Sequence, residues 1–181
     1  MTKSKWFAVD PGSTKSGVVE MSNKFIVEAR IMENDALLSM LKELDSDCLV
    51  LYEDIFAYSN RLGEDVINTI KFIGVLEHEM RKCSVETKAF FRWQVKKFVF
   101  DQYRSVVVPR IELKIEKKNQ KNNDGKDRRP SHVYVDDRIV VAAMKSEWSI
   151  PTPKPGKKSM YNLAKHSWQA LAVATTYMNS L

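Results

Sequence analysis

Short apolar runs separated by turn-forming residues open the chain and predict three strands. They cover residues 5–10, 17–21 and 25–31, are rich in β-branched and aromatic residues, and are joined by tight turns, which favours an antiparallel meander. The continuous apolar run CLVLY at residues 48–52 is typical of a central strand that is buried on both faces. A fifth strand is predicted at residues 85–89.

Helical spacing of apolar residues predicts five helices around these strands. Their expected ranges are 34 or 35 to 44, 65–81, 91–100, 131–147 with Ser131 as the N-cap, and 159–178. The apolar residues of the 65–81 helix cover more than one stripe. We therefore expect that helix to meet both the core and a second subunit.

The stretch 101–130 is interpreted as a basic insertion over the domain. Within it, residues 106–108 could form a strand, and residues 117–129 are polar, charged and expected to be mobile. Residues 151–156 are interpreted as a stiff basic connector. The chain 1–181 is thus predicted to be a single α/β domain with a mixed five-stranded sheet flanked by helices. The predicted order β-β-β-α-β-α-β-α-α resembles that of the ribonuclease H-like fold.

Charge is unevenly distributed along the 181 residues, whose formal net charge is +6. Residues 110–129 hold eight basic and four acidic residues, and residues 150–181 contain four lysines and no acid. Such a local excess suits a polyanionic partner.

Hydropathy and cysteine usage suggest a protein of the reducing cytoplasm. No segment approaches the ~20 apolar residues of a membrane span, and the first residues lack a secretory core. We therefore expect no membrane contact. Cys48 and Cys83 lie far apart without C-x-x-C spacing, which predicts two reduced, buried thiols.

Two acids end apolar strands. Asp10 stands in VDPGST, and it has two interpretations: turn chemistry alone, or a metal-binding carboxylate at a sheet edge where small residues let a phosphate backbone approach. Glu53 ends LVLYE. Because Glu is disfavoured inside strands and seldom buried without a partner, it either reaches the surface or leads into a site.

The last predicted helix is apolar apart from a polar stripe formed by Asn162, His166 and Gln169. A lone His on such a helix is more often a hydrogen-bonded core residue than a ligand. Neutral imidazole could nevertheless complete a site with two carboxylates, since this helix offers no acid.

Four segments resemble, in order, the motifs of RuvC-type Holliday junction resolvases. FAVDPGSTKSGVV is similar to the first strand and its D-P-G-S turn, followed by a further Gly, and CLVLYEDIFAYSN to the second acidic motif. FRWQVKKFV resembles the helix in which R-Q-V-K presents a basic residue, so Lys96 matches the family's lysine. HSWQALAVATTYM resembles the last motif, D-x-x-D-A-L-A-x-A. The motifs frame nearly the whole chain and leave 101–130 uncovered.

This resemblance implies a structure-selective DNA endonuclease. Asp10, Glu53 and His166 would hold one or two Mg²⁺ or Mn²⁺ ions, which activate a water and stabilise the leaving 3′ oxygen. Lys96 would neutralise charge on the phosphate. The expected products carry 5′-phosphate and 3′-hydroxyl ends.

The chain departs from the family at its last motif, where His166 and Gln169 occupy the positions of two aspartates. Some family members have His at the first of these. Neutral Gln169 is a poorer ligand for a hard cation, although its carbonyl oxygen could orient a water or coordinate weakly. Asp136 and Asp137 could supply the missing charge, with Asp137 a candidate metal ligand, or they could stabilise the first turn of their helix. The variation, the small size and the basic insertion resemble a bacteriophage-type member, for which the location would be the host cytoplasm.

The expected partners are branched DNA and a second copy of the chain. A four-way junction has two-fold symmetry, so symmetric cleavage implies a homodimer. Phosphate contacts are expected from basic residues of three segments: Lys97, Arg110, Lys117, Lys118, Arg128, Arg129, Lys157, Lys158 and Lys165. Phe56, Tyr58 and Trp93 could stack on unpaired bases or simply pack in the core.

Other functions remain open on the sequence alone. A branched-DNA binding protein without catalytic activity would keep the basic surfaces, and a related nuclease could prefer flaps, replication forks or RNA. Kinases of the actin-like superfamily also place D-x-G-S/T after their first strand. They need two domains around a nucleotide, for which 181 residues are too few.

Overall fold

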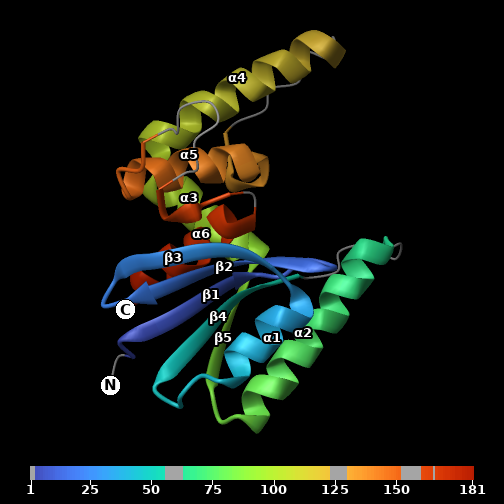
Figure 1. The fold of residues 1–181 in the computed structure, drawn as a ribbon. Helices are drawn as coiled ribbons and strands as arrows, with labels where there is room; N and C mark the ends of the chain where they lie inside the picture. Colours follow the sequence, from blue (N-terminus) through green and yellow to red (C-terminus); the bar gives the residue numbers. More distant parts are fainter. Residues whose placement is uncertain (1–2, 56–62, 123–129, 152–159, 165) are drawn as a thin grey trace.

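The sheet forms the centre of the molecule (Figure 1). The structure, a computed structural model, describes residues 3–55, 63–122, 130–151, 160–164 and 166–181. Five strands pair in the order β3-β2-β1-β4-β5: β1 Lys5–Asp10, β2 Lys15–Ser22, β3 Phe25–Glu33, β4 Cys48–Asp54 and β5 Glu86–Phe91. The first three pair antiparallel, whereas β1 with β4 and β4 with β5 pair parallel. The predicted mixed five-stranded sheet is confirmed.

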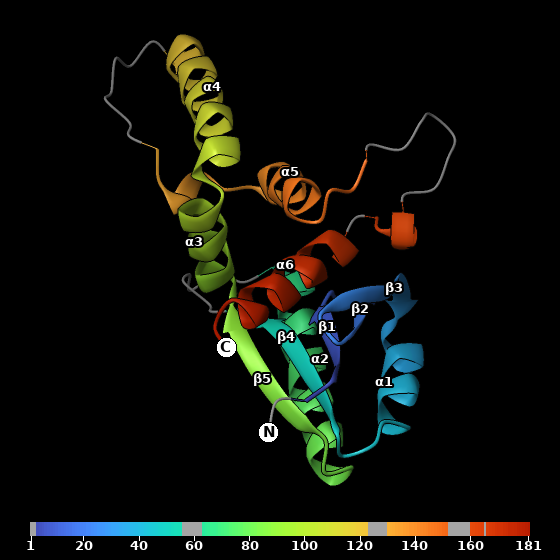
Figure 2. The same cartoon turned by 90° about the vertical axis from the view of Figure 1, so that its left-hand side faces the viewer.

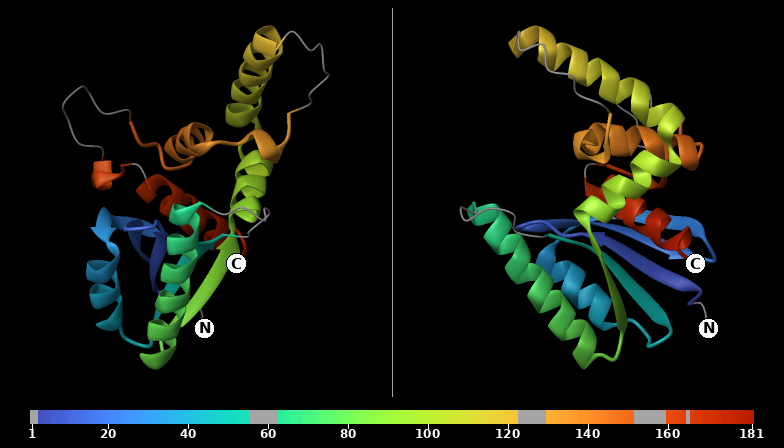
Figure 3. Two further views of the ribbon diagram at one scale, coloured as in Figure 1. Left: turned by 90° about the vertical axis from the view of Figure 1, so that its right-hand side faces the viewer. Right: turned by 180° about the vertical axis from the view of Figure 1, so that it is seen from behind.

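Helices cover both faces of the sheet (Figures 2 and 3). One face carries α1 Asn34–Lys42 and α2 Glu64–Lys82. The other carries α6 His166–Met178, with α3 Arg92–Gln102, α4 Arg104–Asn122 and α5 Asp137–Glu147 stacked beyond it. Two single 3₁₀ turns, His132–Tyr134 and Met160–Asn162, precede α5 and α6. The sheet is therefore the middle layer.

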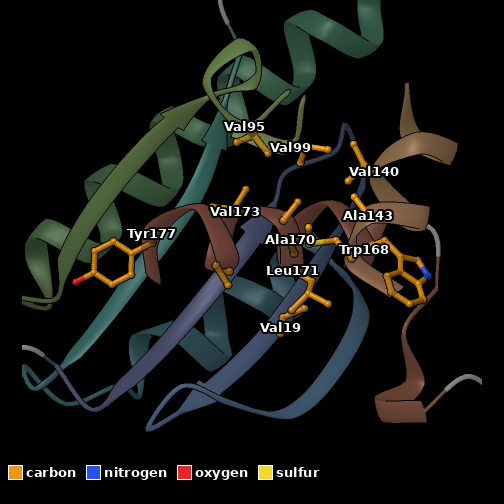
Figure 4. Close-up of a cluster of buried hydrophobic side chains, with 14 of the residues drawn as sticks. Val19, Val95, Val99, Val140, Ala143, Trp168, Ala170, Leu171, Val173 and Tyr177 are labelled. Carbon is orange, nitrogen blue, oxygen red and sulfur yellow. The ribbon is translucent and has the colours of Figure 1, made fainter. Parts of the chain in front are cut away.

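Side chains of the central strands alternate between two cores. In β1, Trp6 and Ala8 face the core on the α6 side, and Phe7 and Val9 face the core under α1 and α2. Figure 4 shows α6 between the sheet and the outer helices, with Val19 of β2 against it. Its residues from Ser167 to Tyr177 are all buried, which accounts for a helix that is apolar on most sides.

The prediction for residues 101–130 was wrong in its secondary structure. Residues 106–108 lie in α4 and do not form a strand, and residues 117–122, expected to be mobile, continue that helix. Val107, Ile111 and Ile115 are buried at helical spacing on its inner face. Three consecutive valines have neither helical nor strand periodicity, so the secondary structure is indicated by the helical spacing of apolar residues over the longer stretch.

Two predicted helix starts were also wrong. The helix expected from Ser131 begins after Asp136, whose side chain accepts hydrogen bonds from the backbone N–H groups of Arg138 and Ile139 at 3.1 Å. The last helix begins at His166, and Asn162 lies in the preceding 3₁₀ turn with a left-handed φ of 59°. Asn162 is therefore not part of a stripe with His166 and Gln169.

Several predictions fall on residues outside the described ranges. They concern the stacking candidates Phe56 and Tyr58, residues 152–156 of the connector, and the basic residues Arg128, Arg129, Lys157, Lys158 and Lys165. Among the described residues, no helix is long and apolar enough to span a membrane. Cys48 is buried and Cys83 half-buried, and both are free thiols.

Candidate active site

The carboxyl ends of β1 and β4 bring two acids together. These neighbouring strands run parallel, and the pairing of Val9 with Tyr52 sets Asp10 beside Glu53. Both are buried, with 5% and 3% of their surface exposed. They line a cleft of about 650 Å³ together with the turn after β1, the start of α2, Arg92 and His166. We call this the Asp10–Glu53 cleft.

Burial and mutual repulsion shape the protonation of the two acids. Loss of hydration, followed by the negative charge of Asp10, raises the pKa of Glu53 to about 8. The two carboxyl groups lie within hydrogen-bonding reach of each other. The pair therefore carries a proton at neutral pH unless a cation neutralises it, and carboxylate oxygens are the ligands that Mg²⁺ and Mn²⁺ prefer.

The turn after β1 is held by half-buried hydrogen bonds. Ser16 Oγ accepts from the Gly12 N–H at 3.3 Å and donates to Asn34 Oδ1 at 2.7 Å, while Asn34 Nδ2 donates to the Gly12 carbonyl at 3.0 Å. A Cβ at Gly12 would lie 2.2 Å from the Lys15 carbonyl oxygen, so only glycine fits. The turn interpretation of the DPGS segment is confirmed, and Asp10 lines the cleft, where metal binding by its carboxylate stays a prediction.

His166 reaches Asp10 from the first residue of α6. Its Nδ1 lies 2.7 Å from Asp10 Oδ2, and this hydrogen bond raises the pKa of the imidazole. The approach depends on Gly17, which lies in β2 and pairs with Asp10 of β1. A Cβ at residue 17 would lie 2.3 Å from the His166 carbonyl carbon and 2.5 Å from the Ser167 nitrogen. Sequence reasoning gave Gly17 no such role, since helix approach is invisible in the chain order.

Arg92 is a cleft residue that sequence reasoning did not assign to the site. It follows β5, the next parallel strand, so it emerges at the same sheet edge as Asp10 and Glu53. Its Nε lies 3.8 Å from Glu53 Oε2, and its Nη2 lies 3.3 Å from Asp137 Oδ1. The position of Arg92 at the end of that third parallel strand was the available signal.

Lys96 lies one helical turn after Arg92 on α3 and is half-buried. Burial, then the positive charge of Arg92, lowers its pKa. The negative charges of Asp137 and Glu53 act in the opposite direction on this pKa, so the Lys96 ammonium lies near the acids of the cleft.

Gln169, Asp136 and Asp137 occupy different places around the site. Gln169 is buried and lines a second groove of about 460 Å³ with His166 and Asp137. Asp137 is exposed and paired with Arg92, so the guanidinium stands between it and Glu53. Asp136 caps α5, so it stabilises the first turn of that helix, as one of the two interpretations from the sequence proposed. It also pairs with Lys114 at 3.0 Å.

Asp10, Glu53 and His166 suit a divalent cation by their chemistry, since two buried, crowded carboxyl groups gain from a positive charge. Nevertheless, no three His, Cys, Asp or Glu side chains within the described ranges form a ready-made metal site. His166 contacts Asp10, and Arg92 contacts Glu53. Metal binding would have to alter these contacts.

The described candidates for DNA contact are exposed. Lys97 pairs with Asp101 on α3, and Arg110, Lys117 and Lys118 lie on the surface of α4. Trp93 on α3 is 44% exposed, which removes core packing as its main role.

Comparison with known proteins rests on structure. No family model matches the chain, and no curated protein matches its sequence. Thermus thermophilus RuvC in complex with a Holliday junction substrate aligns with a TM-score of 0.56 and 15% identity over 96% of this chain and 92% of that one. A second structure of Thermus thermophilus RuvC gives 0.55 and 14%, over 96% and 93%.

The chain has a RuvC-like, ribonuclease H-like fold. The fold class inferred from element order is thereby confirmed. The alignments cover 92% and 93% of the RuvC chains and 96% of this chain, so the shared fold accounts for nearly the whole length of each.

Proposed function

We propose that this protein is a metal-dependent endonuclease that hydrolyses phosphodiester bonds in branched DNA, foremost in four-way junctions. The observation that carries the proposal is the buried Asp10–Glu53 pair at the ends of adjacent parallel strands, in an open cleft with cationic groups on its far wall. A RuvC-like fold around that cleft adds support, because the similar Thermus thermophilus protein is known in complex with a Holliday junction substrate.

In this proposal each cleft residue has a separate task. Asp10 and Glu53, with His166, would hold Mg²⁺ or Mn²⁺, and the ion would activate a water and stabilise the leaving oxygen. Lys96 and Arg92 provide positive charge against the phosphate as negative charge develops. Gln169 contributes a neutral oxygen or amide at the cleft's edge, and Asp137 is a candidate outer ligand once Arg92 moves away.

A homodimer is proposed through α2. Its inner face is buried against the sheet, and three apolar side chains remain exposed on its outer side: Ile67 at 39%, Ile70 at 36% and Val75 at 47%. The two stripes seen in the sequence are thus one core face and one free face. An apolar face of this kind is suited to a second copy, which would give two cleavage sites for a two-fold symmetric junction.

The remaining assignments belong to the same proposal. The basic residues Arg128, Arg129, Lys157, Lys158 and Lys165 would add phosphate contacts, the chain would act as one domain, and its setting would be the cytoplasm of a bacteriophage-infected host. The His166 and Gln169 variation supports the bacteriophage assignment.

A branched-DNA binding protein without catalysis is the second candidate. Gln169 in place of an acid favours it, because a neutral side chain is a poorer ligand for a hard cation. The same cleft would then bind a phosphate without cutting it.

Cleavage of a synthetic mobile four-way junction separates the two candidates. We expect wild-type protein to cut in Mg²⁺ or Mn²⁺ and leave 5′-phosphate ends, and Asp10→Asn or Glu53→Gln to lose at least about 10³-fold in rate, since each removes a charged ligand. His166→Ala is expected to lose less. Asp35→Asn, an exposed acid on α1, is the control. Junction binding without cleavage by the wild type would favour the second candidate.

Sedimentation velocity tests the dimer. Ile70→Glu places a charge on the free face of α2 and should shift the protein to a monomer, while Lys24→Glu should leave it a dimer. A wild-type protein that is monomeric both free and on DNA would contradict the assembly.

A further inference from the structure

A chain of connected depressions runs from the Asp10–Glu53 cleft to α4. The cleft and the second groove share His166, and the second groove shares Arg138 with a third groove of about 440 Å³ between α4 and α5. We propose that this strand track, defined by His166, Arg138 and the third groove, carries the phosphate backbone of one DNA strand away from the cleft. The inference rests on the proposed function and names the path its substrate takes.

The third groove is built from one face of α4. Arg110, Leu113, Lys114 and Lys117 recur at i, i+3, i+4 and i+7 and all line it. With Arg138, they give four basic residues against a single acid, Asp136. This face lies beside the buried one, and Lys114 on it joins α4 to Asp136 and to the Tyr134 carbonyl. A polyanion is the ligand that such a surface fits.

The acids along the strand track are already paired with cations. Asp136 contacts Lys114 at 3.0 Å, and Asp137 contacts Arg92 at 3.3 Å. These pairs remove the repulsion that free carboxylates would exert on phosphates. Acids at the groove edge therefore do not argue against a DNA strand.

The remaining cations keep their charge. Arg110 donates to the Val106 carbonyl at 2.6 Å, a contact that neutralises nothing. Within the described residues, Arg138 and Lys117 form no ion pair. The backbone of Arg138 is held by the cap of α5, to which its N–H donates, and its side chain is exposed. It stands where two grooves meet, which makes it the residue on which the strand track depends.

Continuity separates this surface from a general basic patch. Removing charge from a general basic patch would weaken DNA binding without regard to position. The strand track would instead contact particular phosphates at increasing distance from the scissile phosphate. Arg138 should contact phosphates nearer the cut, and Arg110 and Lys117 those farther along the same strand.

The first test measures junction binding without divalent ions. Arg138→Gln, and the double variant Arg110→Gln with Lys117→Gln, are expected to weaken binding about 5- to 10-fold near 0.1 M salt, with the log–log salt slope falling by about one per lost contact. Lys24→Gln is the matched control. Its exposed lysine follows β2 at the end of the sheet opposite Asp10, so affinity and slope should stay unchanged.

The second test maps the contacts with single methylphosphonates, which neutralise one phosphate at a time. Wild-type protein should lose affinity at a few successive positions on one strand beside the scissile phosphate. Arg138→Gln should become insensitive at the nearest of these positions only, and the double variant at the farther ones. Unchanged melting temperatures would show that the variants are folded.

The outcomes distinguish the inference from the proposed function. If the wild type binds and cuts junctions but both groove variants retain its affinity, salt slope and methylphosphonate profile, the strand track is wrong and the nuclease proposal stands. If the wild type neither binds nor cuts branched DNA, both are wrong.

Discussion

The two walls of the cleft are built in opposite ways. The sheet wall carries Asp10 and Glu53 on strands, almost wholly buried, and the turn after Asp10 is braced by hydrogen bonds among Gly12, Ser16 and Asn34. The helical wall carries Arg92 and Asp137, both exposed and held mainly by ion pairs. Side chains that are buried at the site also contribute to the stability of the fold. Exposed ion pairs contribute only about 0–1 kcal/mol to stability. Changes to the sheet wall should therefore alter the free energy of unfolding, and changes to the helical wall should alter only binding.

Gly17→Ala should produce the largest effect on stability. The new methyl group would overlap backbone atoms of His166 and Ser167, which cannot rotate away, so the N-terminus of α6 must shift. Overpacking of this kind costs about 1–3 kcal/mol or more, and we expect about 3 kcal/mol by urea unfolding. The His166–Asp10 hydrogen bond should break as well.

Gly74→Ala is the control for this substitution. Gly74 lies in α2 with open space around it, so alanine should be neutral or stabilise by up to about 1 kcal/mol through helix propensity. A loss below about 1 kcal/mol in Gly17→Ala would mean that α6 is not held against β2 as described.

Ser16→Ala should be next in size. It leaves the Gly12 N–H and Asn34 Oδ1 without their partner in a half-buried turn, which costs about 1–2 kcal/mol. Ser39→Ala removes an exposed hydroxyl bond on α1 and should cost less than about 0.5 kcal/mol. Equal losses in the two variants, measured by urea unfolding, would show that the turn is not braced.

The same contrast explains what the sequence could predict. The strands of the sheet, and Asp10 and Glu53 at their ends, follow from local apolar runs that stop at an acid, so the sheet wall was predictable. Parallel pairing then brings the acids together without further information. The fold was recognisable because its motifs lie in or beside the sheet.

The helical wall was less predictable because its contacts join residues distant in sequence. Arg92 and Asp137 are 45 positions apart and meet only after α3 and α5 have packed. The close approach of His166 to β2 is possible only because residue 17 is glycine. The helical period of α4 is hard to see in the sequence because three consecutive valines are followed by Pro109. Local secondary-structure propensity gives no information about these long-range contacts.

Glu53→Gln should stabilise the metal-free protein at high pH. The folded-state pKa of Glu53 is raised to about 8, so its contribution to stability is fully present below its unfolded pKa, near 4.5, and is lost as pH rises through 8. The amide lacks this loss. We expect a gain of at least about 1 kcal/mol at pH 9, or at least about 2–4 °C in melting temperature, and little change at pH 5. Glu86→Gln, an exposed acid on β5, is the control. Melting curves with the same pH dependence in Glu53→Gln and wild type would contradict the raised pKa.

Arg92→Gln should change stability least, by less than about 0.5 kcal/mol, because its side chain is 45% exposed and its ion pairs are screened. Its effect should appear in metal binding. The guanidinium supplies positive charge 3.8 Å from Glu53, where an ion would bind, so its removal should tighten Mn²⁺ binding about three- to tenfold in electron paramagnetic resonance titrations. Arg104→Gln at the start of α4 should leave Mn²⁺ affinity unchanged. Weaker Mn²⁺ binding in Arg92→Gln would mean that Arg92 orients Glu53 for the ion, and the helical wall would then share the structural role that the comparison assigns to the sheet.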